Sequence, residues 1–358
     1  MGKRIVIKIG SNVLTRTDQK LDLTRMSSLV DQIALLQQNG IEVLLVSSGA
    51  VASGRSEIQV NKELDSVSAR QLYSAVGQAK LINRYYELFR EQGLNCGQVL
   101  TTKENFASRK HYLTQKHCME VMLQNQVIPI INENDTISVT ELMFTDNDEL
   151  SGLIATMMNA DALIILSNVD GVYDGNPKDN DSKVIRKIPV TKRDLKKYIQ
   201  AEKSSFGRGG MLTKCKIAAK VAEEGIEVII ANGRKEEILS QIVFNEEDTI
   251  CTRFIPNQHT VSNVKRWIAH SEDFAKGTVF INVGAEEVIS SERASSLLFV
   301  GIERIEGDFE KDDLVHIVSE DGRRLGIGCT SFASEDAKML IGKKDLKPMI
   351  HYDYLWLN

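Results

Sequence analysis

The sequence predicts an α/β protein with a doubly wound, mostly parallel sheet, followed by a small C-terminal β-rich domain. Two observations support this prediction. Short apolar segments alternate with amphipathic helical segments as far as about residue 233, and after about residue 262 the pattern changes to short strands punctuated by glycine. Apolar strands that alternate with helices are typical of a parallel sheet covered on both faces. Closely spaced strand signals are typical of a small barrel or sandwich.

Six strands are expected in the first part, and the first of them is short, apolar and rich in β-branched residues. They cover residues 4–10, 41–50, 94–100, 127–131, 161–167 and 226–233. Helical spacing of apolar residues predicts helices over 24–39, 67–91, 106–125 and 211–224, with another that begins at about Glu149. Parallel sheets of this kind bind ligands at the carboxyl ends of their strands.

The C-terminal part is expected to contain strands within 277–284, 295–301, 301–307, 313–319 and 322–328, with a helical segment at 332–341. The rhythm of the chain breaks at Pro256, Asn257 and Gln258. We therefore expect one domain over residues 1–258 and a second over residues 275–350.

Composition excludes several classes of protein. The 358 residues are 42% hydrophobic and 26% charged, with a net charge of −5, which does not favour general binding to nucleic acid or to an anionic membrane. The five cysteines are odd in number and form no C-x-x-C pair, which favours reduced thiols. The N-terminus lacks the long apolar segment of a signal peptide, and no apolar run approaches the ~18 residues of a membrane span. A cytoplasmic protein is expected.

Two clusters of carboxylates and amides follow the strand at 127–131. They are Asn132–Asp135 and Asp146–Glu149, and residues 131–152 contain no Lys, Arg or His. Local chemistry is one possible reason, because Asp146 or Asn147 can cap the helix that follows. Ligand binding is another, and the two are compatible.

Lys8 is the first candidate for phosphate binding. It lies within an apolar strand and is followed by Gly10, and a lysine is rarely buried unless it is paired. The alternative is a lysine at a strand end that reaches solvent. Because Gly10 would let a ligand approach the backbone closely, phosphate neutralisation is a competitive interpretation.

Residues 47–50, Ser-Ser-Gly-Ala, follow the second strand and could present backbone N–H groups to an anion. The segment GAVASGRS (49–56) has the spacing of a P-loop, but Arg55 stands where that motif needs Lys. We interpret the P-loop spacing as a coincidence.

Two later segments are also candidates. GRGGMLTK (207–214) is glycine-rich and opens a helix, which favours phosphate binding at the helix N-terminus over a plain surface loop. SNVDGVYDGNP (167–177) fits local turn chemistry and a nucleotide-binding loop equally well. The six histidines show no ligand spacing with acids or cysteines, so no metal ligand is assigned.

Seven segments resemble, in the same order, the glutamate 5-kinase branch of the amino-acid kinase family, and the chain from about residue 275 resembles a PUA domain. The segments are KIGSNVL (8–14), LVSSGAVASG (45–54), YSAVGQAK (73–80), PIINENDT (129–136), DNDELSG (146–152), SNVDGVYD (167–174) and GRGGMLTK (207–214). The resemblance implies transfer of the γ-phosphoryl group of ATP, with Mg²⁺, to the side-chain carboxylate of L-glutamate, at the start of proline synthesis. It also implies a homo-oligomer, a dimer or tetramer, with proline as a feedback inhibitor.

The resemblance further implies roles for individual residues. The catalytic residues would be Lys8, Asp148 and Lys214. Glutamate would be bound by Ser48, Gly49, Ala50, Asp135 and Asn147. The nucleotide would be bound by Lys8, Gly10, Ser167, Asn168, Arg208, Gly209, Gly210, Met211, Leu212, Thr213 and Lys214. The chain departs from the family pattern at Ser167-Asn168, where Thr-Asp is usual, and at Arg208, where Thr is usual.

The implied reaction accounts for the residue types. A γ-carboxylate with a pKa of ~4.3 is already ionised at neutral pH and needs no general base. It does need charge neutralisation, since two unit charges 4 Å apart repel by about 4 kcal/mol at an effective dielectric near 20. Lys8 and Lys214 would offset this repulsion, and Asp148 between them would keep both charged and oriented. Asp135 would pair with the α-ammonium group of glutamate, while Ser48 and Asn147 would bind its carboxylates.

Two alternatives remain at this point. One is a family member that phosphorylates a different acceptor, such as aspartate, N-acetylglutamate, carbamate or UMP. The other is an RNA-binding protein, because PUA domains often bind RNA. Charge argues against RNA, since residues 263–358 contain 12 Lys and Arg against 17 Asp and Glu.

Overall fold

The computed structural model describes residues 3–18, 20–61, 63–107, 109–137, 144, 146–177, 179, 181–189, 210–256, 267–268, 271, 274–291, 295–344 and 346–357. Arg208 and Gly209 lie outside the described residues. The chain divides into two compact units, one formed by residues 1–103 and 116–260 and the other by residues 104–115 and 261–358. Among the helices that the structure describes, none has the length and apolar character that a membrane span requires.

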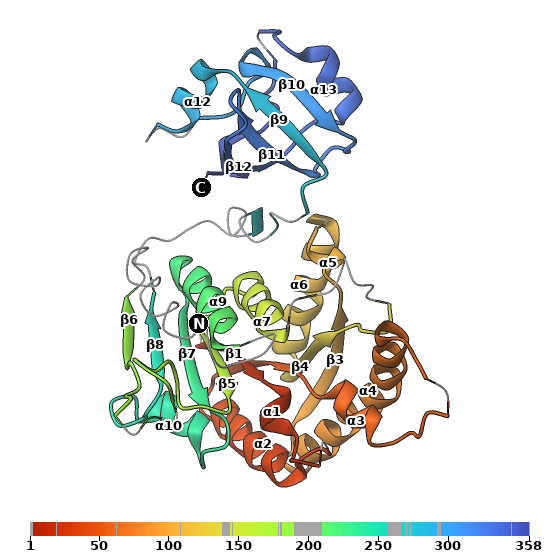
Figure 1. Ribbon diagram of the computed structural model, residues 1–358, viewed down its shortest axis with the longest axis vertical. Coiled ribbons are helices and arrows are strands. Elements are labelled where there is room, and N and C mark those ends of the chain that lie inside the picture. Colours follow the sequence, from red (N-terminus) through yellow and green to blue (C-terminus); the bar gives the residue numbers. More distant parts are fainter. Residues whose placement is uncertain are drawn as a thin grey trace. The chain divides into compact units, whose positions relative to one another are not determined.

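The first unit is built on a mostly parallel sheet with the strand order β3-β4-β2-β1-β5-β7-β8-β6 (Figure 1). Every pairing in the described sheet is parallel except that of β7 with β8. The expected doubly wound α/β architecture is thereby confirmed. Its strands are β1 (Arg4–Ile9), β2 (Glu42–Ser47), β3 (Asn95–Thr101), β4 (Val127–Glu133), β5 (Ala162–Ser167), β6 (Lys187–Pro189), β7 (Glu227–Asn232) and β8 (Thr252–Ile255).

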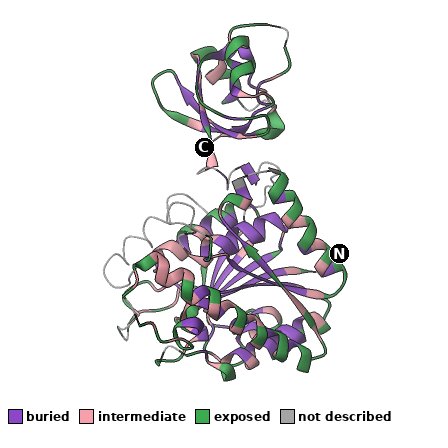
Figure 2. Cartoon of the chain, turned by 90° about the vertical axis from the view of Figure 1, so that its right-hand side faces the viewer, coloured by how far each residue is buried: buried purple, intermediate pink, exposed green. Residues whose placement is uncertain are grey.

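Helices cover both faces of this sheet (Figure 1), and the central strands β4, β2, β1, β5 and β7 are almost wholly buried (Figure 2). The helices of the first unit, together with α5 and α6, are α1 (Ser11–Leu14), α2 (Leu23–Gln38), α3 (Ala50–Arg55), α4 (Ser66–Glu91), α5 (Glu104–Ala107), α6 (Arg109–Gln124), α7 (Asn147–Met157), α9 (Met211–Glu223) and α10 (Ile238–Phe244). The short helix α3 and the strand β8 were not expected from the sequence.

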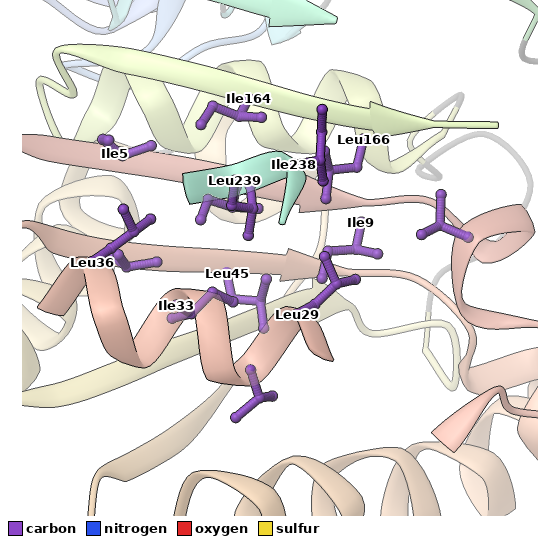
Figure 3. Close-up of a cluster of buried hydrophobic side chains, with 14 of the residues drawn as sticks. Ile5, Ile9, Leu29, Ile33, Leu36, Leu45, Ile164, Leu166, Ile238 and Leu239 are labelled. Carbon is purple, nitrogen blue, oxygen red and sulfur yellow. The ribbon is translucent and has the colours of Figure 1, made fainter. Parts of the chain in front are cut away.

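The alternation of side chains along β1 assigns each residue to one face. Ile5, Ile7 and Ile9 pack with Leu29 and Ile33 of α2 in a single apolar cluster (Figure 3). Because successive side chains of a strand point to opposite faces, Lys8 points to the other face. Helices α7 and α9 pack on that face. The period of the strand therefore directs Lys8 toward the helices that carry Asp148 and Lys214.

The second unit contains a sheet with the order β10-β9-β11-β12-β13 around a core of its own. Its elements are β9 (Gly277–Ile281), α12 (Val283–Ile289), η3 (Phe299–Gly301), β10 (Ile302–Gly307), β11 (Leu314–Ser319), β12 (Arg324–Cys329), α13 (Ser334–Leu340), η4 (Tyr352–Tyr354) and β13 (Leu355–Leu357). The strand expected over 295–301 is wrong. Leu297 makes only an isolated bridge to Ile350, and the chain then turns into the 3₁₀ helix η3.

Candidate active site

A cavity of about 380 Å³ lies at the carboxyl ends of β1, β2 and β5. These three strands are neighbours in the order β2-β1-β5, where the chain crosses from one half of the sheet to the other. Doubly wound sheets bind ligands at such a switch point. The cavity is lined by Lys8, Gly10, Ser11, Asn12, Val13, Ser48, Asp146, Asn147, Asp148, Leu166, Ser167, Asn168, Val169, Pro177, Gly210, Met211 and Lys214.

Asp148 lies between two lysines at this cavity. Lys8 Nζ is 2.6 Å from Asp148 Oδ1, and Lys214 Nζ is 2.6 Å from Asp148 Oδ2. Asp148 is fully buried, and only 5% of Lys8 is exposed. Burial alone would raise the pKa of Asp148, but the two ammonium groups outweigh it and hold that pKa below its ordinary value. Two lysines therefore share one carboxylate, and both border the cavity.

Helix starts position these side chains. Asp146 caps α7, because its Oδ1 accepts from the backbone N–H groups of Asp148 and Glu149. The capping interpretation of the acidic cluster is thus confirmed for Asp146. Lys214 lies in the first turn of α9, which begins directly after Gly210. The N-terminus of α7 is occupied by the Asp146 carboxylate, whereas that of α9, which has no side-chain cap, is a favourable place for an anion such as a phosphate group.

Asp146 has a second, uncommitted oxygen. Its Oδ2 is buried and has no hydrogen-bond partner in the described part of the chain. Burial and the neighbouring charge of Asp148 raise the pKa of Asp146, while Lys8 acts in the opposite direction. Mg²⁺ in nucleotide sites is usually held by one or two carboxylates together with substrate phosphates. No group of three or more His, Cys, Asp and Glu side chains among the described residues could hold a metal. The donor set therefore fits a nucleotide-bound Mg²⁺ better than a cage built from protein alone.

Ser48 and Asn147 lie together on the other side of the cavity. Asn147 Nδ2 is 2.9 Å from Ser48 Oγ and 2.9 Å from Asn132 Oδ1. Ser47, the residue before Ser48, shares a 2.9 Å hydrogen bond with the buried hydroxyl of Tyr85 on α4. Burial raises the pKa of Tyr85, although the hydrogen bond from Ser47 opposes it. Tyr85 was not identified from the sequence, which shows no link from a helix to a distant turn, and Asn132 was noted only as a member of the first cluster.

Gly49 and Ala50 do not line the cavity. Gly49 adopts a φ of 107°, which favours glycine, and forms the N-cap of α3. In α3, a Cβ at Gly54 would overlap with the carbonyl oxygen of Tyr73 in α4. Arg55 lies over the ring of Tyr73, 5.3 Å from its centroid. Gly54 of the P-loop-like segment therefore allows α3 and α4 to pack closely. This role agrees with our interpretation of the P-loop spacing as a coincidence.

Asp135 also lies away from this cavity and has a partner that sequence reasoning missed. Arg70 Nε donates to Asp135 Oδ1 at 2.7 Å, and a terminal nitrogen of Arg70 lies 2.9 Å from Glu133 Oε2. Asp135 lines a second cavity of about 240 Å³ with Ser74, Ala75, Gln78, Ala79, Gln98, Leu100, Glu133, Asn134 and Thr136. The second acidic cluster is thus neutralised by Lys8 and Lys214, and the first by a cation from α4.

The expected nucleotide residues divide into three groups. Gly10, Ser167, Asn168, Gly210 and Met211 line the first cavity with the two lysines. Leu212 and Thr213 lie in α9 but do not line it. Arg208 and Gly209 lie outside the described residues, so their expected contacts remain predictions.

The loop after β5 shows the expected turn chemistry and also lines the cavity, while its nucleotide-binding role stays a prediction. Asp174 Oδ1 accepts from the backbone N–H of Lys183, which is local turn chemistry. Ser167, Asn168, Val169 and Pro177 of the same segment line the cavity. Asp170 of the same loop accepts a hydrogen bond from Asn232 at the end of β7 and forms an ion pair with Lys235.

Comparison with known proteins assigns this architecture. Residues 3–232 match the amino acid kinase family, and residues 277–352 match the PUA domain. The chain belongs to the amino acid kinase family. It is 64% identical to the "Glutamate 5-kinase" of Bacteroides thetaiotaomicron, over 99% of this chain and 98% of that protein. It is 48% identical to the "Glutamate 5-kinase" of Chlorobaculum tepidum, over 99% of this chain and 97% of that protein.

A solved structure supports the fold of this amino acid kinase family member independently. The carbamate kinase of Giardia lamblia bound to AMP-PNP matches with a TM-score of 0.52 and 20% identity. The match covers 72% of this chain and 99% of that one. At this identity the likeness concerns the fold alone.

Proposed function

We propose that the protein transfers the γ-phosphoryl group of ATP to the side-chain carboxylate of L-glutamate, which forms L-glutamyl 5-phosphate and ADP. In this role it would catalyse the first step of proline biosynthesis. The observation that supports the proposal most is the placement of Lys8 and Lys214 on the two oxygens of the buried Asp148, at the border of the cavity. The relatives named glutamate 5-kinase, similar over nearly their whole length, favour glutamate as the acceptor.

The proposed chemistry needs no general base. A carboxylate oxygen of glutamate attacks the γ-phosphorus, and the bond from that phosphorus to the β,γ-bridging oxygen breaks. ADP leaves with the electron pair of that bond, and no proton is transferred. The absence of a histidine from the described residues that line the cavity agrees with this requirement.

The two lysines would act on the charge that is shared among the oxygens during transfer. Removal of a group that stabilises developing charge typically slows an enzyme by about 10²–10³-fold. Asp148 would orient both ammonium groups, because each of its oxygens contacts one of them. Without that carboxylate, Lys8 and Lys214 would repel each other in the empty site.

When bound, Mg²⁺ would offset phosphate charge. Asp146 is the residue that we propose to hold it, directly or through water, since its Oδ2 is buried and uncommitted among the described residues. The start of α9 after Gly210 would bind phosphate oxygens through backbone N–H groups.

Glutamate would be oriented by groups on the β2 and β4 side. Ser48 and Asn147 hydrogen-bond each other at the cavity and carry no charge that would repel a carboxylate. Asp135 would pair with the α-ammonium group. A cytoplasmic location fits these substrates and the five free thiols. Assembly as a homo-oligomer and inhibition by proline are further parts of the proposal.

The direct test is ADP release with a panel of acceptors. With ATP and Mg²⁺, L-glutamate should support turnover, whereas aspartate, N-acetylglutamate, carbamate and UMP should support little. Preference for any of these other acceptors would refute glutamate as the substrate and leave a different kinase of the same family.

A further inference from the structure

Arg70 lies between the two carboxylates that follow β4. Its Nε donates to Asp135 Oδ1 at 2.7 Å, and one terminal nitrogen lies 2.5 Å from that oxygen and 2.9 Å from Glu133 Oε2. Glu133 is 4% exposed and Asp135 is 8% exposed. The two carboxylates are therefore buried, while 37% of the Arg70 side chain is exposed, and its one guanidinium contacts both carboxylates.

The cluster is held in place by its surroundings. Arg70 belongs to α4, and Gln71 of the same helix donates to the carbonyl oxygen of Thr136 at 3.0 Å. Glu133 Oε1 accepts from the backbone N–H of Phe144 at 3.1 Å. The turn that carries Asp135 is thus tied to α4 through more than the ion pair.

We infer that Arg70 is a positioning residue, which holds Asp135 in the orientation and charge state that bind the α-ammonium group of the amino-acid substrate. The inference rests on the proposed function. Arg70 itself would touch neither the transferred phosphoryl group nor the carboxylate that receives it.

Charge balance shows why the arginine is needed. One guanidinium and two carboxylates have a net charge of −1, which is the complement of one ammonium group. Burial raises the pKa of Asp135, and Arg70 opposes that rise. Without Arg70, two buried carboxylates would lie together without that cation, and the pKa of Asp135 would rise further. A protonated Asp135 cannot form an ion pair with ammonium.

The charged groups around Asp135 determine how its charge responds to pH. Arg70 contributes a cation from α4, and Glu133 contributes a carboxylate from β4. The other residues that line the adjoining cavity, on α4, on β3 and on the 134–136 turn, are uncharged: Ser74, Ala75, Gln78, Ala79, Gln98, Leu100, Asn134 and Thr136. Within the described residues, the charges that face Asp135 are therefore those of Arg70 and Glu133.

The test compares Arg70→Gln, Arg70→Lys and the double variant Arg70→Gln with Glu133→Gln. Steady-state kinetics with glutamate would be measured between about pH 6 and pH 8.5, where glutamate keeps its ammonium charge. Arg70→Gln should raise KM for glutamate by about tenfold or more near pH 7. That KM should fall as the pH rises, because Asp135 regains its charge, and kcat should change much less than KM.

The other two variants distinguish the effect of the charge of Arg70 from the effect of the shape of its side chain. Arg70→Lys keeps the cation, so its KM should lie close to wild type and vary little with pH. The double variant removes one cation and one carboxylate, which restores a net charge of −1, so the pH dependence should weaken again. Arg84→Gln is the matched control, because Arg84 lies on the same helix and pairs with Glu87 on its surface. It should behave as wild type.

A KM for Arg70→Gln that matches wild type, or that rises equally at every pH, would overturn the inference. A fall in kcat with no change in KM would overturn it too. Should Arg70→Gln not fold, Arg70→Lys and the double variant still decide the question through their pH profiles. Turnover of glutamate by the wild type tests the proposed function separately.

Discussion

Lys214 Nζ lies 2.6 Å from Asp148 Oδ2, although 66 residues separate the two in the chain. Lys214 is in the first turn of α9, and Asp148 is in the first turn of α7. Two helix starts on one face of the sheet thus place a cation and a buried carboxylate at the same cavity. The pairing orients the ammonium group while its charge remains available to a ligand.

Replacing Lys214 by alanine should affect the chemical step. We expect Lys214→Ala to lower kcat by about 10²–10³-fold and to raise the KM for glutamate far less, because contacts made in the transition state appear in kcat. Steady-state kinetics with glutamate would measure both constants. Lys216→Ala is the control, since Lys216 is exposed on the same helix. An unchanged kcat in Lys214→Ala would remove Lys214 from the mechanism.

Asp135→Asn should affect glutamate binding alone. The substitution removes the charge that we propose to pair with the α-ammonium group, so the KM for glutamate should rise about tenfold or more. Affinity for ATP, measured by titration, should hardly change, because Asp135 does not line the cavity beside Lys8 and Lys214. Equal weakening of both ligands would show that the residue has a structural role.

Gly77→Ala should destabilise the fold through the contact of α3 with α4. A Cβ at Gly77 would overlap with the backbone carbonyl oxygen of Ala50, which cannot move as a flexible side chain can. We expect a loss on the order of 3 kcal/mol in the free energy of unfolding. Thermal unfolding would measure it. Gly284→Ala is the control, expected to leave Tm nearly unchanged, because its Cβ would make only an ordinary contact with Asn282 Oδ1 at 3.6 Å.

The C-terminal β-rich domain should not be needed for chemistry. Each residue with a proposed catalytic role lies before residue 215, so a chain that ends near residue 255 should still phosphorylate glutamate. Its assembly or its response to proline would be the property that changes. A folded, monodisperse truncated chain without kinase activity would falsify this separation of roles.

The position of the truncation determines whether one buried contact, that of Trp267 with Phe106, is kept. Trp267 is 1% exposed and donates from its indole nitrogen to the carbonyl oxygen of Phe106 at 2.9 Å, and its ring lies 6.1 Å from that of Tyr112. A chain that ends near residue 255 lacks Trp267 and should aggregate more than one that ends near residue 275. Size-exclusion chromatography of the two truncated chains would measure the difference.

The pattern of the sequence was sufficient for most of the fold. The six strands expected in the first part all form, and five of them are apolar because a buried parallel strand must be apolar along most of its length, whereas β3 is partly exposed. The strand that was predicted over residues 295–301 by the same reasoning does not form. Leu297 and Phe299 are buried, while Leu298 and Val300 are exposed. That alternation matches a strand, although no ladder forms there.

The site was predictable only where a motif contained the residues. Lys8, Asp148 and Lys214 were assigned through sequence motifs, and the structure brings them within ion-pair distance. Arg70 and Tyr85 were missed, because each acts from α4 on a turn that is distant in sequence. Helical periodicity predicts which side of a helix is apolar, but it does not predict which strand end the helix will contact.

The most direct test of the proposed reaction is to trap its product. An acyl phosphate reacts with hydroxylamine to give a hydroxamate, so the protein would be incubated with ATP, Mg²⁺, hydroxylamine and L-glutamate. We predict an ATP-dependent γ-hydroxamate of glutamate, identified by mass spectrometry. ADP release without this hydroxamate, or hydroxamate formation from aspartate or N-acetylglutamate in preference to glutamate, would contradict the claim that the side-chain carboxylate of glutamate receives the phosphoryl group.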